Sequence, residues 1–244
     1  MIIMKKVSLF NPKKFINHFG FLGRGFLFAG ISITILGMIF GVLAPEENVQ
    51  GHIFKMMYLH VPSSFFAMSI YIVMGICSLL FIIYKIPVLY FVSSVLSKIG
   101  AILCAISLIS GSIWGRFTWG TFWVWDARVV SMFVLFLLYL GYVFCDMYTD
   151  DKIKKVATSV LAVLGLLNIP IIKFSVEFYN TLHQKPTIFA LKKPSIDFEM
   201  LFPLVVIMIG ISMCISYTVV LSAKKRIKNQ KSISKRTRVL IQYA

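Results

Sequence analysis

Six long apolar runs constrain the fold of this chain more than any other feature. A transmembrane helix requires about 20 consecutive, mostly apolar residues, and it must be a helix because lipid offers no partner to an unpaired backbone group. The runs that meet this length are residues 21–43, 62–84, 92–113, 127–145, 156–174 and 201–222. They predict an all-α integral membrane protein with six transmembrane helices.

The composition excludes an ordinary soluble domain. Charged residues make up 14% of the 244 residues and hydrophobic residues 59%, whereas about a quarter of a soluble domain is normally charged. The formal net charge is +16, which in a soluble protein would suggest nucleic-acid binding. Here the cations lie at the chain ends and in short segments between apolar runs, which favours a membrane protein that does not bind nucleic acid.

The distribution of Lys and Arg predicts the orientation. With a cytoplasmic N-terminus, 18 of the 25 cations lie on the cytoplasmic side and 7 on the outer side, as the positive-inside rule requires. Both termini are then cytoplasmic, and the first run stays as an anchor because no small-residue cleavage site follows it. The expected parts are a cytoplasmic segment 1–20, a membrane domain 21–222 and a basic cytoplasmic tail 223–244, with outward segments 44–61, 114–126 and 175–200.

One outward segment, residues 114–126, contains all four tryptophans of the chain: Trp114, Trp119, Trp123 and Trp125. Tryptophan favours the lipid–water boundary, so an aromatic belt is one interpretation. A belt, however, is spread over many helix ends, whereas these four indoles share one segment. Gly115 and Gly120 allow the backbone to approach a ligand closely. The segment therefore favours a platform for a flat ligand.

A porphyrin suits such a platform. Its apolar face stacks on indole rings, its propionates pair with cations such as Arg116 and Arg128, and its iron commonly takes a histidine as axial ligand. His60 and His183 both lie in or beside outward segments, which predicts an axial pair.

The remaining histidines and the four cysteines have different expected roles. His52 also lies outside and is a rival ligand, whereas His18 lies on the cytoplasmic side and is expected to be solvated. The four cysteines form no C-x-x-C or C-x-x-C-H motif. The absence of these motifs argues against covalent c-type heme attachment and against a thioredoxin-like role. They are expected to be small buried hydrophobes: Cys77, Cys104, Cys145 and Cys214.

Three motifs together carry a family resemblance. Residues 119–128 read Trp-Gly-Thr-Phe-Trp-Val-Trp-Asp-Ala-Arg, residues 60–62 His-Val-Pro, and residues 180–184 Asn-Thr-Leu-His-Gln. The first resembles the tryptophan-rich "WWD" signature of heme-handling proteins, and the three in this order resemble cytochrome c maturation protein C, the heme exporter protein C family. This chain departs from the family at three places. It has Phe122 where the family usually has a further tryptophan, and Phe178-Tyr179 where the family has a Trp-Trp pair. It also has Lys185 between Gln184 and Pro186, where the family commonly has Gln-Pro directly.

The resemblance implies a heme-handling component rather than an enzyme. Heme b, held non-covalently, would stack over the Trp-rich segment with His60 and His183 as axial ligands. Asp126 would orient the segment. The protein would present heme to a periplasmic heme chaperone, with an ABC-transporter ATP-binding subunit, a second membrane subunit and a small single-span subunit as partners. The chain has no G-x-x-x-x-G-K-[ST] loop for ATP. The expected location is a bacterial inner membrane or its mitochondrial counterpart.

Three alternatives remain open on the sequence. A heme lyase of the same superfamily would generally have more spans and larger outer domains. A small-solute permease would place ionisable or polar groups along a pathway within the spans, for which Lys98 and Asn168 are candidates. A passive assembly subunit would use its tryptophans only as anchors.

Overall fold

The described part of this computed structural model is helical. It comprises residues 23–149, 151–179, 181–183 and 196–242, so the expected segment 1–20, His18 and Lys185 lie outside it. The elements are α2 (Arg24–Leu43), η3 (His52–Met56), α3 (Met57–Tyr84), α4 (Pro87–Trp119), α5 (Ala127–Tyr148), α6 (Asp151–Gly165), α7 (Asn168–Phe178) and α8 (Phe198–Gln242). Six helical segments are long and apolar enough to cross a membrane, with η3–α3 and α6–α7 each counting as one. The predicted six-helix class is confirmed.

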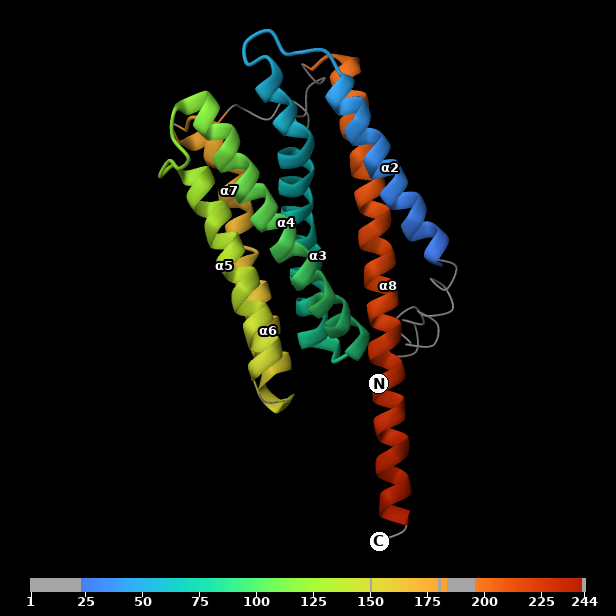
Figure 1. The fold of residues 1–244 in the computed structure, drawn as a ribbon. Helices are drawn as coiled ribbons and strands as arrows, with labels where there is room; N and C mark the ends of the chain where they lie inside the picture. Colours follow the sequence, from blue (N-terminus) through green and yellow to red (C-terminus); the bar gives the residue numbers. More distant parts are fainter. Residues whose placement is uncertain (1–22, 150, 180, 184–195, 243–244) are drawn as a thin grey trace.

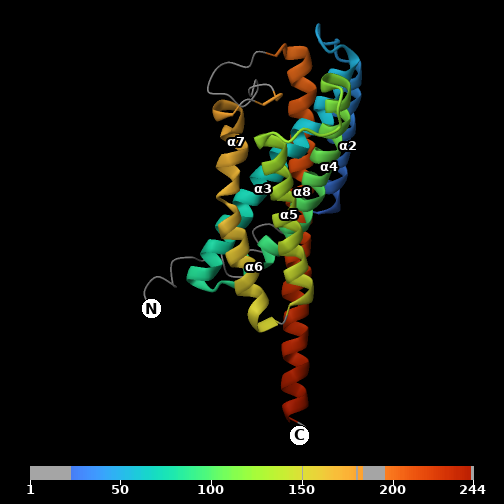
Figure 2. The ribbon, with the colours of Figure 1, turned by 90° about the vertical axis from the view of Figure 1, so that its left-hand side faces the viewer.

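The helices run roughly along one common direction (Figures 1 and 2). The contacts pair α2 with α8 and α3 with α4, while α5 packs on α4, α6 and α7. We call the end of the bundle that carries the connection 120–126 the loop end. We call the end from which the last turns of α8 extend the tail end. Figure 1 shows that α2 also begins toward the tail end, so α2 and α8 are antiparallel.

Glycine allows several helices to approach closely. A Cβ at Gly37 of α2 would lie 2.7 Å from Ile207 Cγ1 of α8, and one at Gly30 would lie 3.0 Å from Gly210 O. A Cβ at Gly100 of α4 would lie 2.2 Å from the ring of Tyr139 on α5. Small residues of this kind promote helix packing in membranes, where burial from water does not drive association.

α4 is longer than the sequence indicated. It continues past residue 113 to Trp119, so the predicted outward segment 114–126 consists of a helix end followed by a short connection. The helix stops at Gly120, whose φ of 78° lies in the left-handed region that glycine adopts without strain. Gly115 does not interrupt the helix, because its bare face accommodates the ring of Trp119.

The fifth span is broken between α6 and α7. Pro170 has no amide hydrogen and cannot donate to the carbonyl of Leu166. That carbonyl instead accepts from Ile169 N at 3.2 Å, and Leu166 N and Leu167 N likewise bond three residues back. The span therefore changes to a tighter turn at residues 166–167 and resumes at Asn168.

We expect Gly100→Ala to destabilise the bundle, because its methyl group would overlap the buried ring of Tyr139. Overpacking of a core commonly costs about 1–3 kcal/mol. Thermal unfolding of the purified protein in detergent measures the effect. Gly25→Ala is the matched control, since a Cβ at Gly25 meets nothing within 4 Å. Equal melting temperatures for the two variants would contradict the close α4–α5 packing.

Candidate functional site

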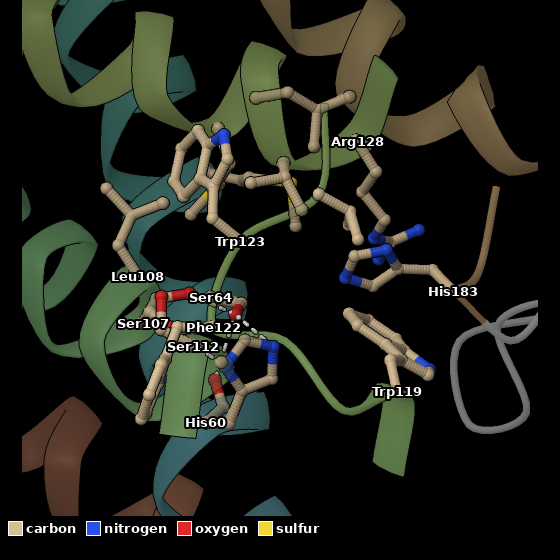
Figure 3. Close-up of a pocket in the computed structure, with 16 residues that line it drawn as sticks. His60, Ser64, Ser107, Leu108, Ser112, Trp119, Phe122, Trp123, Arg128 and His183 are labelled. Carbon is tan, nitrogen blue, oxygen red and sulfur yellow. Dashed lines mark hydrogen bonds between the residues drawn. The ribbon is translucent and has the colours of Figure 1, made fainter. Parts of the chain in front are cut away.

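A pocket at the loop end brings together residues from five parts of the chain. His60 comes from α3, Trp119 from the end of α4, Trp123 from the connection 120–126 and Arg128 from α5, while His183 follows α7. Figure 3 shows the side chains converging on one space. The free volume is about 60 Å³, which holds a few water molecules. Sequence motifs more than 120 residues apart therefore form one site.

The imidazole of His60 is held through Nδ1. Nδ1 lies 3.0 Å from the carbonyl oxygen of Ser107, and a carbonyl only accepts, so Nδ1 carries the proton and donates it. The lone pair of the neutral ring is then on Nε2. Ser64 Oγ, 3.5 Å from Nε2, is at the limit of hydrogen bonding. Gly111 leaves room for the ring, since a Cβ there would lie 2.8 Å from Cε1 of His60.

His183 is held in the same way by a carboxylate. Its Nδ1 lies 3.1 Å from Asp126 Oδ2. Burial lowers the pKa of His183 below its ordinary value, and this effect outweighs the hydrogen bond and charge of Asp126, which raise it. The neutral ring therefore donates Nδ1–H to Asp126 and keeps its lone pair on Nε2. The ring also meets Trp119 edge-on, with centroids 4.7 Å apart.

Asp126 has two structural roles. Its Oδ1 accepts from Val129 N at 2.8 Å and caps the start of α5, while Oδ2 accepts from His183. The family resemblance implied that Asp126 orients the Trp-rich segment, and Asp is also a favoured residue at a helix N-cap. In the structure it caps the helix and also fixes a histidine from the next outward segment.

The two histidines share a feature of metal-ligating histidines. In such sites one ring nitrogen binds the metal and the other donates to a carbonyl or carboxylate, which fixes the tautomer and the orientation of the ring. His60 uses a backbone carbonyl and His183 a carboxylate, and in both rings Nε2 keeps the lone pair. Within the described ranges, no group of three or more His, Cys, Asp or Glu could hold a metal by itself. The pair suits an ion that brings its other ligands with it.

The four tryptophans have different positions. Trp119 and Trp123 line the pocket. Trp114 lies beside His60, with ring centroids 5.9 Å apart, and donates Nε1–H to Gln50 at 2.8 Å. Trp125 is 83% exposed and meets Trp123 edge-on. Trp123 Nε1 is buried and has no hydrogen-bond partner among the described residues.

The arginines also differ. Arg128 lines the pocket. Arg116 is exposed, donates to the carbonyl of Gly120 and lies with its guanidinium 5.7 Å from the centre of the Phe122 ring. It is not among the residues that line the pocket, so its expected pairing with a propionate stays a prediction.

Other candidates lie elsewhere. His52 is exposed, and its Nε2 lies 3.0 Å from Glu46 Oε1, outside the pocket lining. Asn168 donates to Ser131 O at 2.8 Å and so joins α7 to α5. Lys98 is exposed on α4. Neither position supports the permease alternative.

Sequence reasoning missed the residues that support His60. Ser64 follows His60 by four positions, and Ser107 and Gly111 are also four apart on α4, so each pair occupies one helix face. That spacing was a usable signal, but it did not show that the two faces meet.

The comparisons with known proteins decide the family. The profile of the family described as CcmC, heme exporter protein C, matches residues 5–238.

The chain belongs to the heme exporter protein C family.

Relatives in several organisms agree. A heme exporter protein C of Bradyrhizobium diazoefficiens is 35% identical over 86% of this chain and 80% of its own length. One of Haemophilus influenzae is 38% identical over 75% of this chain and 76% of its own. A mitochondrial protein of Marchantia polymorpha, described as cytochrome c biosynthesis ccmC-like, is 41% identical over 68% of this chain and 70% of its own length. The family resemblance seen in the motifs is confirmed.

We expect Asp126→Asn to lower the pKa of His183 further, because the carboxylate raises it by charge and by hydrogen bonding. NMR titration of protein labelled at histidine Cε1 measures this without any ligand. Glu46→Gln is the matched control, since its carboxylate contacts His52 instead. A higher His183 pKa in Asp126→Asn, or the same shift in the control, would contradict the Asp126–His183 contact.

Proposed function

We propose that this membrane protein binds heme b between His60 and His183 at the loop end and delivers it for c-type cytochrome biogenesis. Family membership supports heme export as the general role, since relatives carry the name heme exporter protein C, which describes a transport component rather than an enzyme. One observation carries the specific site. Two imidazoles, each held through Nδ1 with its lone pair on Nε2, line one pocket walled by Trp119 and Trp123.

The chemistry of the pocket fits heme. Histidine nitrogen is a common axial ligand of heme iron, and the low pKa of His183 keeps its ring neutral, as ligation requires. The indoles offer faces and edges for stacking. Arg128 is a cation for a propionate, and the unpartnered Nε1–H of Trp123 is a further donor.

Loading heme requires the pocket to open. Its free volume of about 60 Å³ is well below the roughly 300 Å³ at which pockets for small molecules begin. The connection 120–126 is the segment suited to move. Thr121 Oγ1 donates to the carbonyl of Trp123 within the connection, and Phe122 and Trp125 are largely exposed. Asp126 would stay in place as the cap of α5.

Delivery would take place at the exposed rim. Trp125 and Phe122 project beside the pocket and provide apolar contact surface for a periplasmic heme chaperone. ABC-transporter subunits and a small single-span subunit would complete the assembly and supply ATP hydrolysis. We place the protein in the inner membrane of a bacterium or mitochondrion, with the loop end outside. Residues 1–20 and the basic segment 223–244 would then be cytoplasmic, the latter continuing α8 as far as Gln242.

We expect His60→Ala and His183→Ala each to convert a six-coordinate low-spin heme into a five-coordinate or weakly held one. Visible absorption spectra of protein reconstituted with hemin measure this, and added imidazole should partly restore the low-spin spectrum by filling the vacant position. His52→Ala is the matched control because His52 lies outside the pocket lining. An unchanged low-spin spectrum in either pocket variant would exclude that histidine as a ligand.

The orientation makes a separate prediction. Single cysteines introduced as Thr121→Cys and Lys228→Cys, in protein whose four native cysteines are replaced, should react from opposite sides of the membrane. In intact cells an impermeant maleimide should modify only the Thr121 position, while the Lys228 position should react only after permeabilisation. The 18-to-7 distribution of cations is the physical reason. Modification of both positions in intact cells would overturn the topology.

A further inference from the structure

A second cavity lies between α2, α4 and α8, away from the heme pocket. Its free volume is about 340 Å³, and aliphatic side chains such as Ile35, Ile102 and Ile215 form its walls. The two threonines that line it do not offer a donor. Thr34 Oγ1 donates to Gly30 O and Thr218 Oγ1 to Cys214 O, each at 2.8 Å within its own helix. The walls therefore favour an apolar occupant along this length.

The length of the cavity can be read from its lining residues. The lining positions on α8 run from Ile211 to Thr218, which is about 10 Å at 1.5 Å per residue. The dimensions suit an extended hydrocarbon chain.

Two helices that form the cavity each place a cation on its tail-end side. Arg24 lies seven residues before Ile31 on α2, and Lys98 four residues before Ile102 on α4. Both spacings put the cation on the same helix face as the lining residue. Both α2 and α4 run toward the loop end, so each cation lies on the tail-end side of the cavity. Both cations are exposed.

α8 provides a third cation in the same way. Lys225 follows the lining residue Thr218 by seven positions on a helix that runs toward the tail end, and it too is exposed. The α2–α8 register agrees with this placement. Gly37 lies against Ile207 and Gly30 against Cys214, so Arg24 is level with about residue 220 of α8. In the described ranges none of the three cations pairs with a carboxylate.

We propose that this cavity binds one acyl chain of an anionic phospholipid, whose phosphate is held by Arg24, Lys98 and Lys225. The apolar walls favour a hydrocarbon chain, and the three cations favour an anionic headgroup at the tail end of the bundle rather than a wholly apolar partner. This gives Lys98, a cation within an apolar span, a binding partner. The inference does not depend on heme binding.

Native mass spectrometry of the full chain, exchanged into mixed phosphatidylglycerol and phosphatidylcholine, tests the proposal. The wild-type protein should retain one phosphatidylglycerol under activation that removes phosphatidylcholine. The triple variant Arg24→Gln, Lys98→Gln, Lys225→Gln should lose this preference by at least about tenfold, since each basic residue near a membrane surface contributes roughly a fivefold preference for anionic lipid. Ile215→Trp, which fills the cavity, should reduce retention of both lipids.

The matched control is Lys85→Gln, Lys154→Gln, Lys155→Gln, which removes the same charge at the tail end from the end of α3 and from α6, two helices that do not line the cavity. It should keep the wild-type preference. An equal loss in the two triple variants would reduce the effect to general membrane attraction and overturn the proposal. Retention of both lipids in Ile215→Trp would also overturn the proposal. So would a separate experiment in which a photo-reactive residue at position 215 cross-links to a co-purifying polypeptide instead of to lipid. Hemin spectra of the same variants should be unchanged, so failure here is distinguishable from failure of the heme site.

Discussion

The structure depends on one constraint, namely that polar groups buried in an apolar bundle need partners within the protein. Tyr139 on α5 donates to the carbonyl of Ala67 on α3, and Asn168 on α7 donates to that of Ser131 on α5. Asp146, a buried carboxylate near the tail end, accepts from Tyr90 and Ser94 of α4. These bonds join helices at fixed positions, so they determine the rotation of each helix and the face it presents. The orientation of His60 follows from the same requirement, since its Nδ1–H finds a carbonyl on α4.

The site combines a fixed part with a part suited to move. His60 projects from α3 and is held by Ser107 of α4. His183 is held by Asp126, the N-cap residue of α5. The group that supports each imidazole therefore belongs to the helical bundle. The rest of the connection, residues 120–125, is held mainly by contacts with residues 116–133 and covers the pocket with Trp123. The proposed function requires heme to be both held and released, and fixed histidines beside an aromatic cover on a short connection suit both needs. Gly120, in the left-handed region, separates the cover from α4.

The two ends of the bundle differ in chemistry. The loop end gathers the tryptophans and the pocket histidines, whereas the tail end carries an apolar cavity flanked by Arg24, Lys98 and Lys225. Separate groups of residues line the pocket and the cavity, with α4 contributing to both. Trp119 and Gly111 lie near the loop end of that helix, and Lys98 and Ile102 nearer the tail end. A single long helix therefore contributes to both linings, with different residues in each.

The sequence by itself determined the membrane class, the six spans and the candidate ligands, because hydropathy and cation placement are properties of local segments. Helix ends were less certain, as α4 shows by continuing to Trp119 until a glycine stops it. Only the tertiary structure decided which candidates meet. It placed Trp123 in the pocket and Trp125 at the surface, left Arg116 and His52 outside, and joined Asp126 to His183 across 57 positions. Such contacts depend on how whole helices rotate and pack, and that packing is set by glycine clefts and interhelical hydrogen bonds whose two partners lie far apart in the chain.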